Sequence, residues 1–137
     1  MIVEERIYTL LPGKTAEYFR AYATEGMAIQ VAHLGPMLGY YSTESGPLNT
    51  LVHLWGYENA ADREARRARM LADPAWQVYI KKVQPLVVTQ ESRILNPAPF
   101  FAPRLAAIMA TMTATTAATM TAGGSGEHPA PGSATPG

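Results

Sequence analysis

The segment from Asn49 to Trp76 constrains the fold of this chain more than any other part. Within it, residues 48–57 are a predicted strand whose two faces are both largely apolar: Leu48, Thr50, Val52, Leu54 and Gly56 on one, Asn49, Leu51, His53, Trp55 and Tyr57 on the other. Alternate side chains of a strand point to opposite faces, so we expect both faces to be buried. Asn59 can cap a helix that ends near Ala72, and Asp73-Pro74 can begin another that carries Trp76.

The other predicted elements place this strand in a sheet. Residues 2–10 form a first strand with Glu4, Arg6 and Tyr8 on one face, and residues 15–34 form a helix that Gly35-Pro36 ends. The remaining strands are residues 37–43 and 86–95. This order predicts an α+β, ferredoxin-like βαββαβ sandwich with a four-stranded antiparallel sheet. The helices cover one face only, so we expect a second chain to cover the other, forming a dimeric α/β barrel with a Glu4–Arg6 ion pair at its seam.

The composition changes near Pro103, which predicts a domain boundary there. Residues 1–103 hold all aromatic residues and form the predicted domain, whereas residues 104–137 have only two charged residues, Arg104 and Glu127. Such a segment buries too little side chain to offset the entropy of ordering it. Residues 104–137 are therefore expected to be a disordered tail, with at most a frayed helix over residues 104–112.

The charge and cysteine content exclude several classes of function. Eleven basic and eleven acidic residues balance, so a nucleic-acid partner is not expected. The chain has no cysteine, which excludes disulfides and cysteine-ligated metals, and its three histidines lack metal-ligand spacing. No cofactor motif is present. Residues 105–122 contain too many threonines for a membrane span, and the first residues do not form a signal peptide, so a cytoplasmic location is expected.

A set of residues spread over about 2–101 carries a family resemblance: Glu4, Arg6, Tyr8, residues 10–14, Gly39, residues 48–49, His53, Trp55, Tyr57, Arg63, Arg67, residues 73–76, residues 94–95 and residues 97–100. As a set they resemble the NIPSNAP family of the dimeric α/β-barrel superfamily. The resemblance implies a ferredoxin-like fold, a homodimer or larger homo-oligomer, and a pocket between sheet and helices. It implies no established reaction, although the superfamily includes cofactor-independent monooxygenases, haem-binding proteins and isomerases.

The candidate site residues follow from the predicted strand faces. His53 is a candidate general base or haem ligand, although a hydrogen-bonded core histidine is the favoured alternative. Trp55 and Tyr57 are candidates for an aromatic pocket wall and also for core packing. Tyr8 adds a phenolic donor near the sheet.

Two polar residues, Arg63 and Asn49, complete the predicted site. Arg63 and Arg67 share a helix face. Arg63 is the better ligand candidate because it lies one turn from the strand that carries Tyr57, whereas Arg67 is assigned to structural ion pairing. Asn49 and Arg63 are the groups placed to polarise a carbonyl or enolate.

Two functions remain open. The first is a homodimeric small-molecule-binding or interaction module without chemistry of its own. The alternative is a cofactor-independent enzyme, monooxygenase- or isomerase-like, acting on an apolar or aromatic metabolite while His53 moves a proton. Whether His53 reaches a pocket discriminates between them.

Overall fold

The computed structural model describes residues 1–122. Its elements are β1 (Ile2–Leu10), α1 (Thr15–Ala21), the π-helical turn η1 (Tyr22–Gly26), α2 (Met27–Leu34), β2 (Met37–Ser42), β3 (Thr50–Tyr57), α3 (Ala60–Ala72), α4 (Pro74–Val83), the 3₁₀ turn η2 (Gln84–Leu86), β4 (Val87–Leu95) and α5 (Ala102–Ala122). The strands pair in the order β2-β3-β1-β4, and each neighbouring pair is antiparallel. The predicted ferredoxin-like fold is confirmed.

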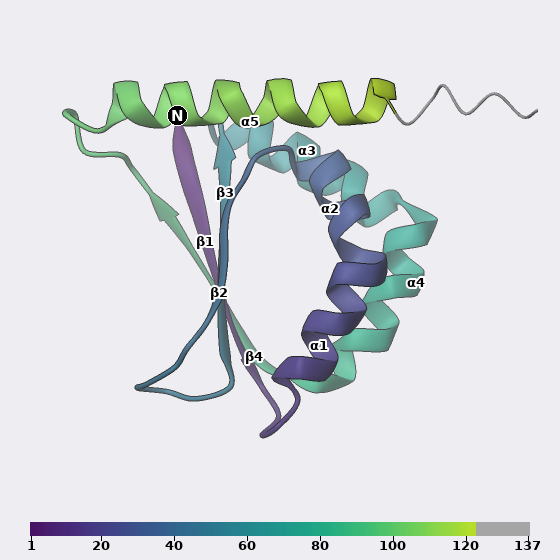
Figure 1. Cartoon of the computed structure of the whole chain (residues 1–137). Helices are drawn as coiled ribbons and strands as arrows, with labels where there is room; N and C mark the ends of the chain where they lie inside the picture. Colours follow the sequence, from purple (N-terminus) through teal and green to yellow (C-terminus); the bar gives the residue numbers. More distant parts are fainter. Residues whose placement is uncertain (123–137) are drawn as a thin grey trace, which may run out of the picture.

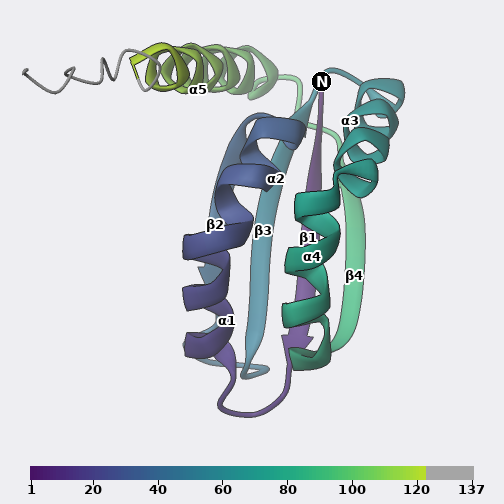
Figure 2. The ribbon, with the colours of Figure 1, turned by 90° about the vertical axis from the view of Figure 1, so that its right-hand side faces the viewer.

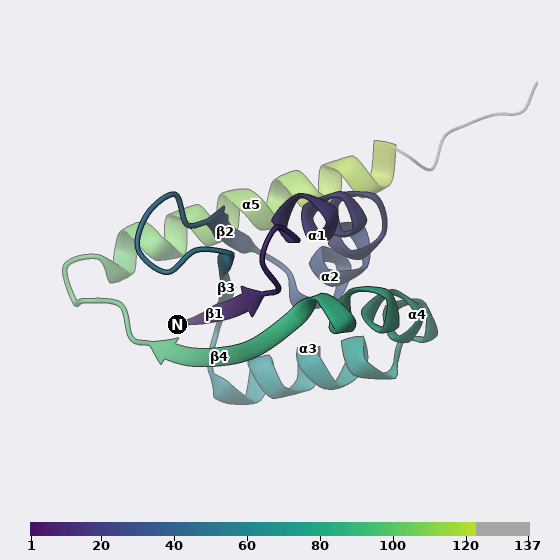
Figure 3. The same ribbon diagram turned by 90° about the horizontal axis from the view of Figure 1, so that it is seen from below.

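The helices α1 to α4 cover one face of the sheet (Figure 1). Figures 2 and 3 show the α1–α2 helix and α4 running side by side along the strands over this face. Residues 15–34 form one helical segment as expected, interrupted by the π-turn. The turn ends at Gly26, where a Cβ atom would overlap the Tyr79 ring. The absence of a side chain there lets α4 pack closely against this helix.

The core lies between these helices and the inner face of the sheet. Leu51, His53, Trp55 and Tyr57 of β3 are at most 1% exposed, which confirms burial on this side. Beyond the sheet, His33 of α2 contacts Asp73 through Nε2 and Oδ2 at 2.7 Å, and Asp73 also caps α4 by accepting from the Ala75 amide. The α1–α2 helix is thereby tied to the junction of α3 and α4 within the one helical layer.

Residues 104–122 form most of α5, whereas the sequence predicted at most a frayed helix over residues 104–112 and disorder beyond it. Alanine has the highest helix propensity, and threonine hydroxyls donate to carbonyls four residues earlier, as from Thr111 to Ala107 at 3.0 Å. Leu105 and Met109, one turn apart, are also buried. The burial of Leu105 and Met109 supplies packing that the composition of this segment does not indicate. Residues 123–137 lie outside the described part of the chain.

The first turns of α5 cover part of the outer face of the sheet, which corrects the expectation that a single chain covers only one face. Figures 1 and 2 show α5 crossing one end of the sheet nearly perpendicular to the strands. Met109 packs so closely on Gly56 that a Cβ atom there would lie 2.8 Å from its sulfur. Farther along the same face, Ile7 and Val52 are partly exposed and Tyr41 is 57% exposed.

The Glu4–Arg6 ion pair forms, with 2.9 Å between Oε1 and Nη1. Its predicted place at a seam between two chains is wrong. Glu4, Tyr8 and Leu10 share one face of β1, and all three are buried toward the helices. The ion pair therefore belongs to the interior of one chain.

Candidate functional site

The polar centre of the helix-covered face is the carboxylate of Glu4, which is fully buried. Its Oε1 accepts three hydrogen bonds: from Arg63 Nη2 at 2.7 Å, Ser92 Oγ at 2.8 Å and Arg6 Nη1 at 2.9 Å. Tyr57 donates a longer bond to Oε2, at 3.4 Å. Burial alone would raise the pKa of Glu4, but the bonds from Arg63, Ser92 and Arg6 outweigh burial and lower the pKa to about 2.

Arg67 is the third arginine near this carboxylate. Its Nη1 lies 3.9 Å from Glu4 Oε2, close enough for charge attraction but not for a hydrogen bond. The same nitrogen is buried and has no acceptor within residues 1–122. Burial and the charge of Arg6 lower the pKa of Arg67. One carboxylate thus faces three guanidinium groups, leaving an excess of two positive charges.

A cavity of about 490 Å³ opens beside this cluster, between β1, β4, the α1–α2 helix and the pair α3–α4. Its lining residues are Arg6, Tyr8, Tyr18, Gln30, Arg67, Met70, Leu71, Trp76, Ile80, Val83, Gln84, Val87, Val88, Thr89 and Gln90. The rim includes exposed Leu71 and Val88, whereas Trp76 and Val83 are buried. Apolar walls with a few convergent polar groups are typical of small-molecule sites.

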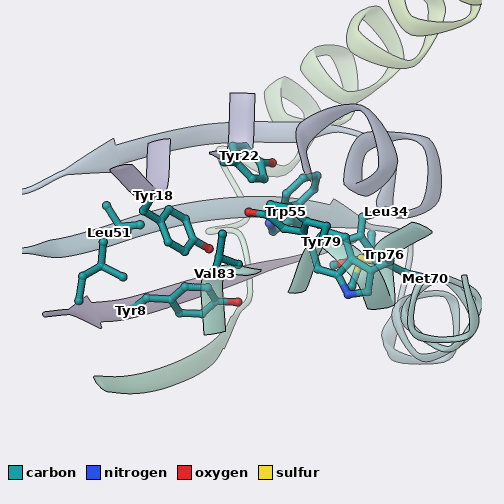
Figure 4. Close-up of a cluster of buried hydrophobic side chains, with 12 residues drawn as sticks. Tyr8, Tyr18, Tyr22, Leu34, Leu51, Trp55, Met70, Trp76, Tyr79 and Val83 are labelled. Carbon is teal, nitrogen blue, oxygen red and sulfur yellow. The ribbon is translucent and has the colours of Figure 1, made fainter. Parts of the chain in front are cut away.

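Tyr8 connects the cavity with the charged cluster. Its hydroxyl oxygen accepts from Arg6 Nε at 2.8 Å. Figure 4 shows Tyr8 from β1 and Tyr18 from α1 approaching the same interior region as Val83. Tyr18 is 3% exposed, and burial raises its pKa to about 12. The Tyr18 phenol is therefore protonated at neutral pH.

His53 lies behind this wall and does not line the cavity. Its Nδ1 accepts from Trp55 Nε1 at 2.7 Å, and its ring stacks on Tyr40 with centroids 4.6 Å apart. The Tyr8 ring meets it edge-on at 4.9 Å. Burial, then the charge of Arg6, lowers the pKa of His53 to about 3. His53 is thus a neutral core side chain whose Nε2 has no partner within the described residues.

The other predicted site residues are dispersed. Trp55 and Tyr57 are fully buried in the core, and Arg63 donates to Glu4, so none of the three lines the cavity. Asn49 precedes β3 with φ +56° and accepts from the Gly13 amide through Oδ1 at 3.1 Å. About eight residues of strand, roughly 27 Å, separate it from Tyr57.

Tyr8 is the one predicted site residue that lines the cavity. Sequence reasoning assigned Arg6 and Arg67 to ion pairing, and it did not include Trp76 or Gln30 among the site residues. The signal for Arg6 was its place between Glu4 and Tyr8 on one strand face. Arg67 shares a helix face with Arg63, and only the packing of α3 on the sheet decides which of them reaches Glu4. Within residues 1–122, no cluster of side chains has metal-binding composition.

Comparisons with known proteins agree with this architecture. A family model described as NIPSNAP matches residues 3–102. An uncharacterised NIPSNAP-like domain protein from Burkholderia xenovorans is 51% identical, with a TM-score of 0.71 over 72% of this chain and 86% of that one. A NIPSNAP family protein of unknown function from Agrobacterium tumefaciens is 40% identical, with a TM-score of 0.72 over 73% and 90% of the two chains.

More distant relatives are longer or share only the fold. Protein NipSnap homolog from Dictyostelium discoideum is 33% identical over 94 residues, which are 69% of this chain and 41% of that protein. The chain thus spans well under half the length of this curated relative, and it spans 34% of a homologue from Danio rerio. An antibiotic biosynthesis monooxygenase, 10% identical with a TM-score of 0.53 over 72% of this chain and all of that one, shows the fold alone.

The Glu4 carboxylate predicts a stability test. Glu4→Gln should lower the free energy of unfolding by about 3–5 kcal/mol, because it removes a fully buried charge and leaves three partly buried guanidinium groups without their counter-charge. Urea denaturation at pH 7 measures the loss. Glu17→Gln is the control, because its ion pair with Lys14 is exposed and should contribute less than about 1 kcal/mol. If Glu4→Gln folds poorly, Ser92→Ala removes a single bond to Oε1 and should cost about 1 kcal/mol. Equal losses for Glu4→Gln and Glu17→Gln would contradict this role.

The lowered pKa of His53 predicts a pH dependence of stability. Between pH 6.5 and about 3, the unfolded chain binds a proton at this histidine that the folded chain does not. The free energy of unfolding should therefore decrease as the pH is lowered, by about 1.4 kcal/mol per pH unit below pH 6. The lowered pKa of Glu4 should add to this decrease below pH 4.5. Denaturation at pH 4.5–7 should give a shallower dependence for His53→Gln. Parallel curves would mean that His53 is protonated in the folded protein.

Proposed function

This chain belongs to the NIPSNAP family, and we propose that it binds a small molecule in the cavity beside β4. The observation that carries the proposal is the composition of the cavity wall. Trp76, Ile80 and Val83 of α4 form its apolar side, and polar groups gather on the side of β1. A volume of about 490 Å³ lies within the roughly 300–1,000 Å³ range of ligand sites.

Binding is preferred over catalysis because the chemical groups of the enzyme alternative do not meet. That alternative needs His53 within hydrogen-bond reach of a substrate. His53 is 1% exposed, lies outside the cavity lining and has a strongly lowered pKa. Among residues 1–122, no other candidate base meets a nucleophile in the cavity. A cofactor-independent monooxygenase or isomerase using His53 therefore has no supporting geometry.

A neutral apolar probe tests the cavity. N-phenyl-1-naphthylamine should bind with increased fluorescence. Ile80→Trp should reduce its affinity at least tenfold, a loss of binding free energy on the order of that from burying one to two methylene groups. Val78→Trp is the matched control, because Val78 lies on the same helix but is 60% exposed. Circular dichroism and thermal melting confirm folding of both variants. Unchanged binding by Ile80→Trp would place the probe elsewhere, such as under α5, and would overturn the proposal.

We infer further that a second copy of the chain covers the uncovered part of the outer sheet face. Ile7, Val52 and Tyr41 are aligned there across three strands by the sheet register. Beside them, Glu5 and Arg93 form an ion pair at 3.5 Å, so this face carries both signs of charge and can complement its own copy. A lysine at the centre of such an interface would be desolvated without a partner.

Val52→Lys should accordingly convert a dimer into a monomer. Size-exclusion chromatography with light scattering, at micromolar concentration, measures the mass of the wild-type chain and of the variant. Val78→Lys, on the exposed side of α4, should leave the dimer intact. A folded wild-type monomer would contradict the dimer without affecting the ligand cavity.

No helix within residues 1–122 is long and apolar enough to cross a membrane. The cytoplasmic location expected from the sequence stays a prediction.

A further inference from the structure

The cavity wall carries two positive side chains, Arg6 and Arg67, and no carboxylate. Glu4 is the nearest counter-charge, but its Oε1 already accepts from Arg6, Arg63 and Ser92. Its Oε2 is 3.9 Å from Arg67. The carboxylate of Glu4 is therefore bonded within the cluster and is not among the groups that line the cavity.

Arg67 is singled out by its missing partner. Four buried side-chain atoms within residues 1–122 have no hydrogen-bond partner: His53 Nε2, Arg63 Nε, Arg67 Nη1 and Tyr79 Oη. Of these, only Arg67 Nη1 belongs to a residue that lines the cavity. A buried guanidinium nitrogen without an acceptor is costly, and an anion bound in the cavity would satisfy it.

A second donor lies on the same wall. The Tyr8 oxygen accepts from Arg6 Nε, so its own hydroxyl proton remains available, and no acceptor for it is recorded within the described residues. An ionised carboxylate has two acceptor oxygens and forms short, strong bonds with guanidinium and phenol donors. Arg67 and Tyr8 together therefore match the needs of one carboxylate.

The rest of the cavity selects what the anion is attached to. Met70, Leu71 and Trp76 continue the wall away from Arg67, followed by Ile80, Val83 and Val87. These side chains offer hydrophobic contact and few hydrogen bonds. A ligand that satisfies both parts of the cavity has a single charged end and an apolar body.

We propose that the cavity binds an amphipathic carboxylate, with its head group at Arg67 and Tyr8 and its alkyl or aryl body along α4. The inference rests on the proposed binding function and names its ligand class. Arg67 forms the expected ion pair with Glu4 at 3.9 Å, but no hydrogen bond of Glu4 involves it, and the proposal adds a binding role to that pairing.

The experiment compares decanoate with decanamide, which has the same chain and a planar but neutral head. Both compete with N-phenyl-1-naphthylamine for the wild-type protein at pH 7.5. Decanoate should bind on the order of 10–100-fold more tightly, as expected for charge-assisted hydrogen bonds. Arg67→Gln should abolish this preference while leaving decanamide affinity unchanged, and circular dichroism confirms that the variant folds. Arg67→Lys should retain part of it.

Arg69→Gln is the matched control, because Arg69 is exposed on the same helix. Equal affinity for decanoate and decanamide, no competition by either, or an unchanged preference in Arg67→Gln would overturn the inference. Competition by inorganic phosphate as strong as that by decanoate would mean a bare anion site and would also overturn it. In each case, probe binding that Ile80→Trp removes would leave the proposed function standing. Loss of that dependence would instead contradict the binding function itself.

Discussion

The rest of this structure depends on the hydrogen bonds that the buried carboxylate of Glu4 accepts. Its hydrogen-bond donors come from β1, β3, β4 and α3, so one side chain joins the sheet to the helical layer. A carboxylate in this position would be strongly unfavourable without such donors. Because Arg63 reaches Oε1 from α3, the position of that helix over the sheet is coupled to the charge. The cavity beside β4 lies next to this cluster, and residues of α3 and α4 form part of its wall.

The same interaction explains why the cavity is positively charged. Glu4 lies at the centre of three arginines, and its hydrogen bonds go to two of them, leaving Arg67 next to open space. Arg67 remains tolerable because its side chain is 19% exposed, so solvent screens part of the charge. An anionic ligand would displace that solvent and supply the acceptor.

The fold could be predicted from the sequence because its signals are local. The alternation of β3, the Asn59 and Asp73 caps and the Gly35-Pro36 stop each depend on residues within a few positions. The site could not be predicted to the same extent. Asn49 and Tyr57 share a strand face yet lie at opposite ends of it, and Arg63 and Arg67 share a helix face yet differ in partners. The length of α5 beyond residue 112 was missed because alanine and threonine contribute little to an apolar stripe, although the helix propensity of alanine and two buried side chains favour the helix.

The position of His53 shows how a residue typical of catalysis can serve packing instead. The buried indole of Trp55 needs an acceptor for its N–H, and His53, two residues earlier on the same strand face, supplies Nδ1. That bond fixes the histidine tautomer with its proton on Nε2. Burial, and then the neighbouring charge of Arg6, lower the pKa of His53 and so keep the ring neutral against Tyr8 and Tyr40. The neutral ring of His53 packs edge-on against the ring of Tyr8, and Tyr8 lines the cavity. His53 therefore acts on the candidate site by positioning Tyr8, and the charges that would recognise a ligand belong to the arginines.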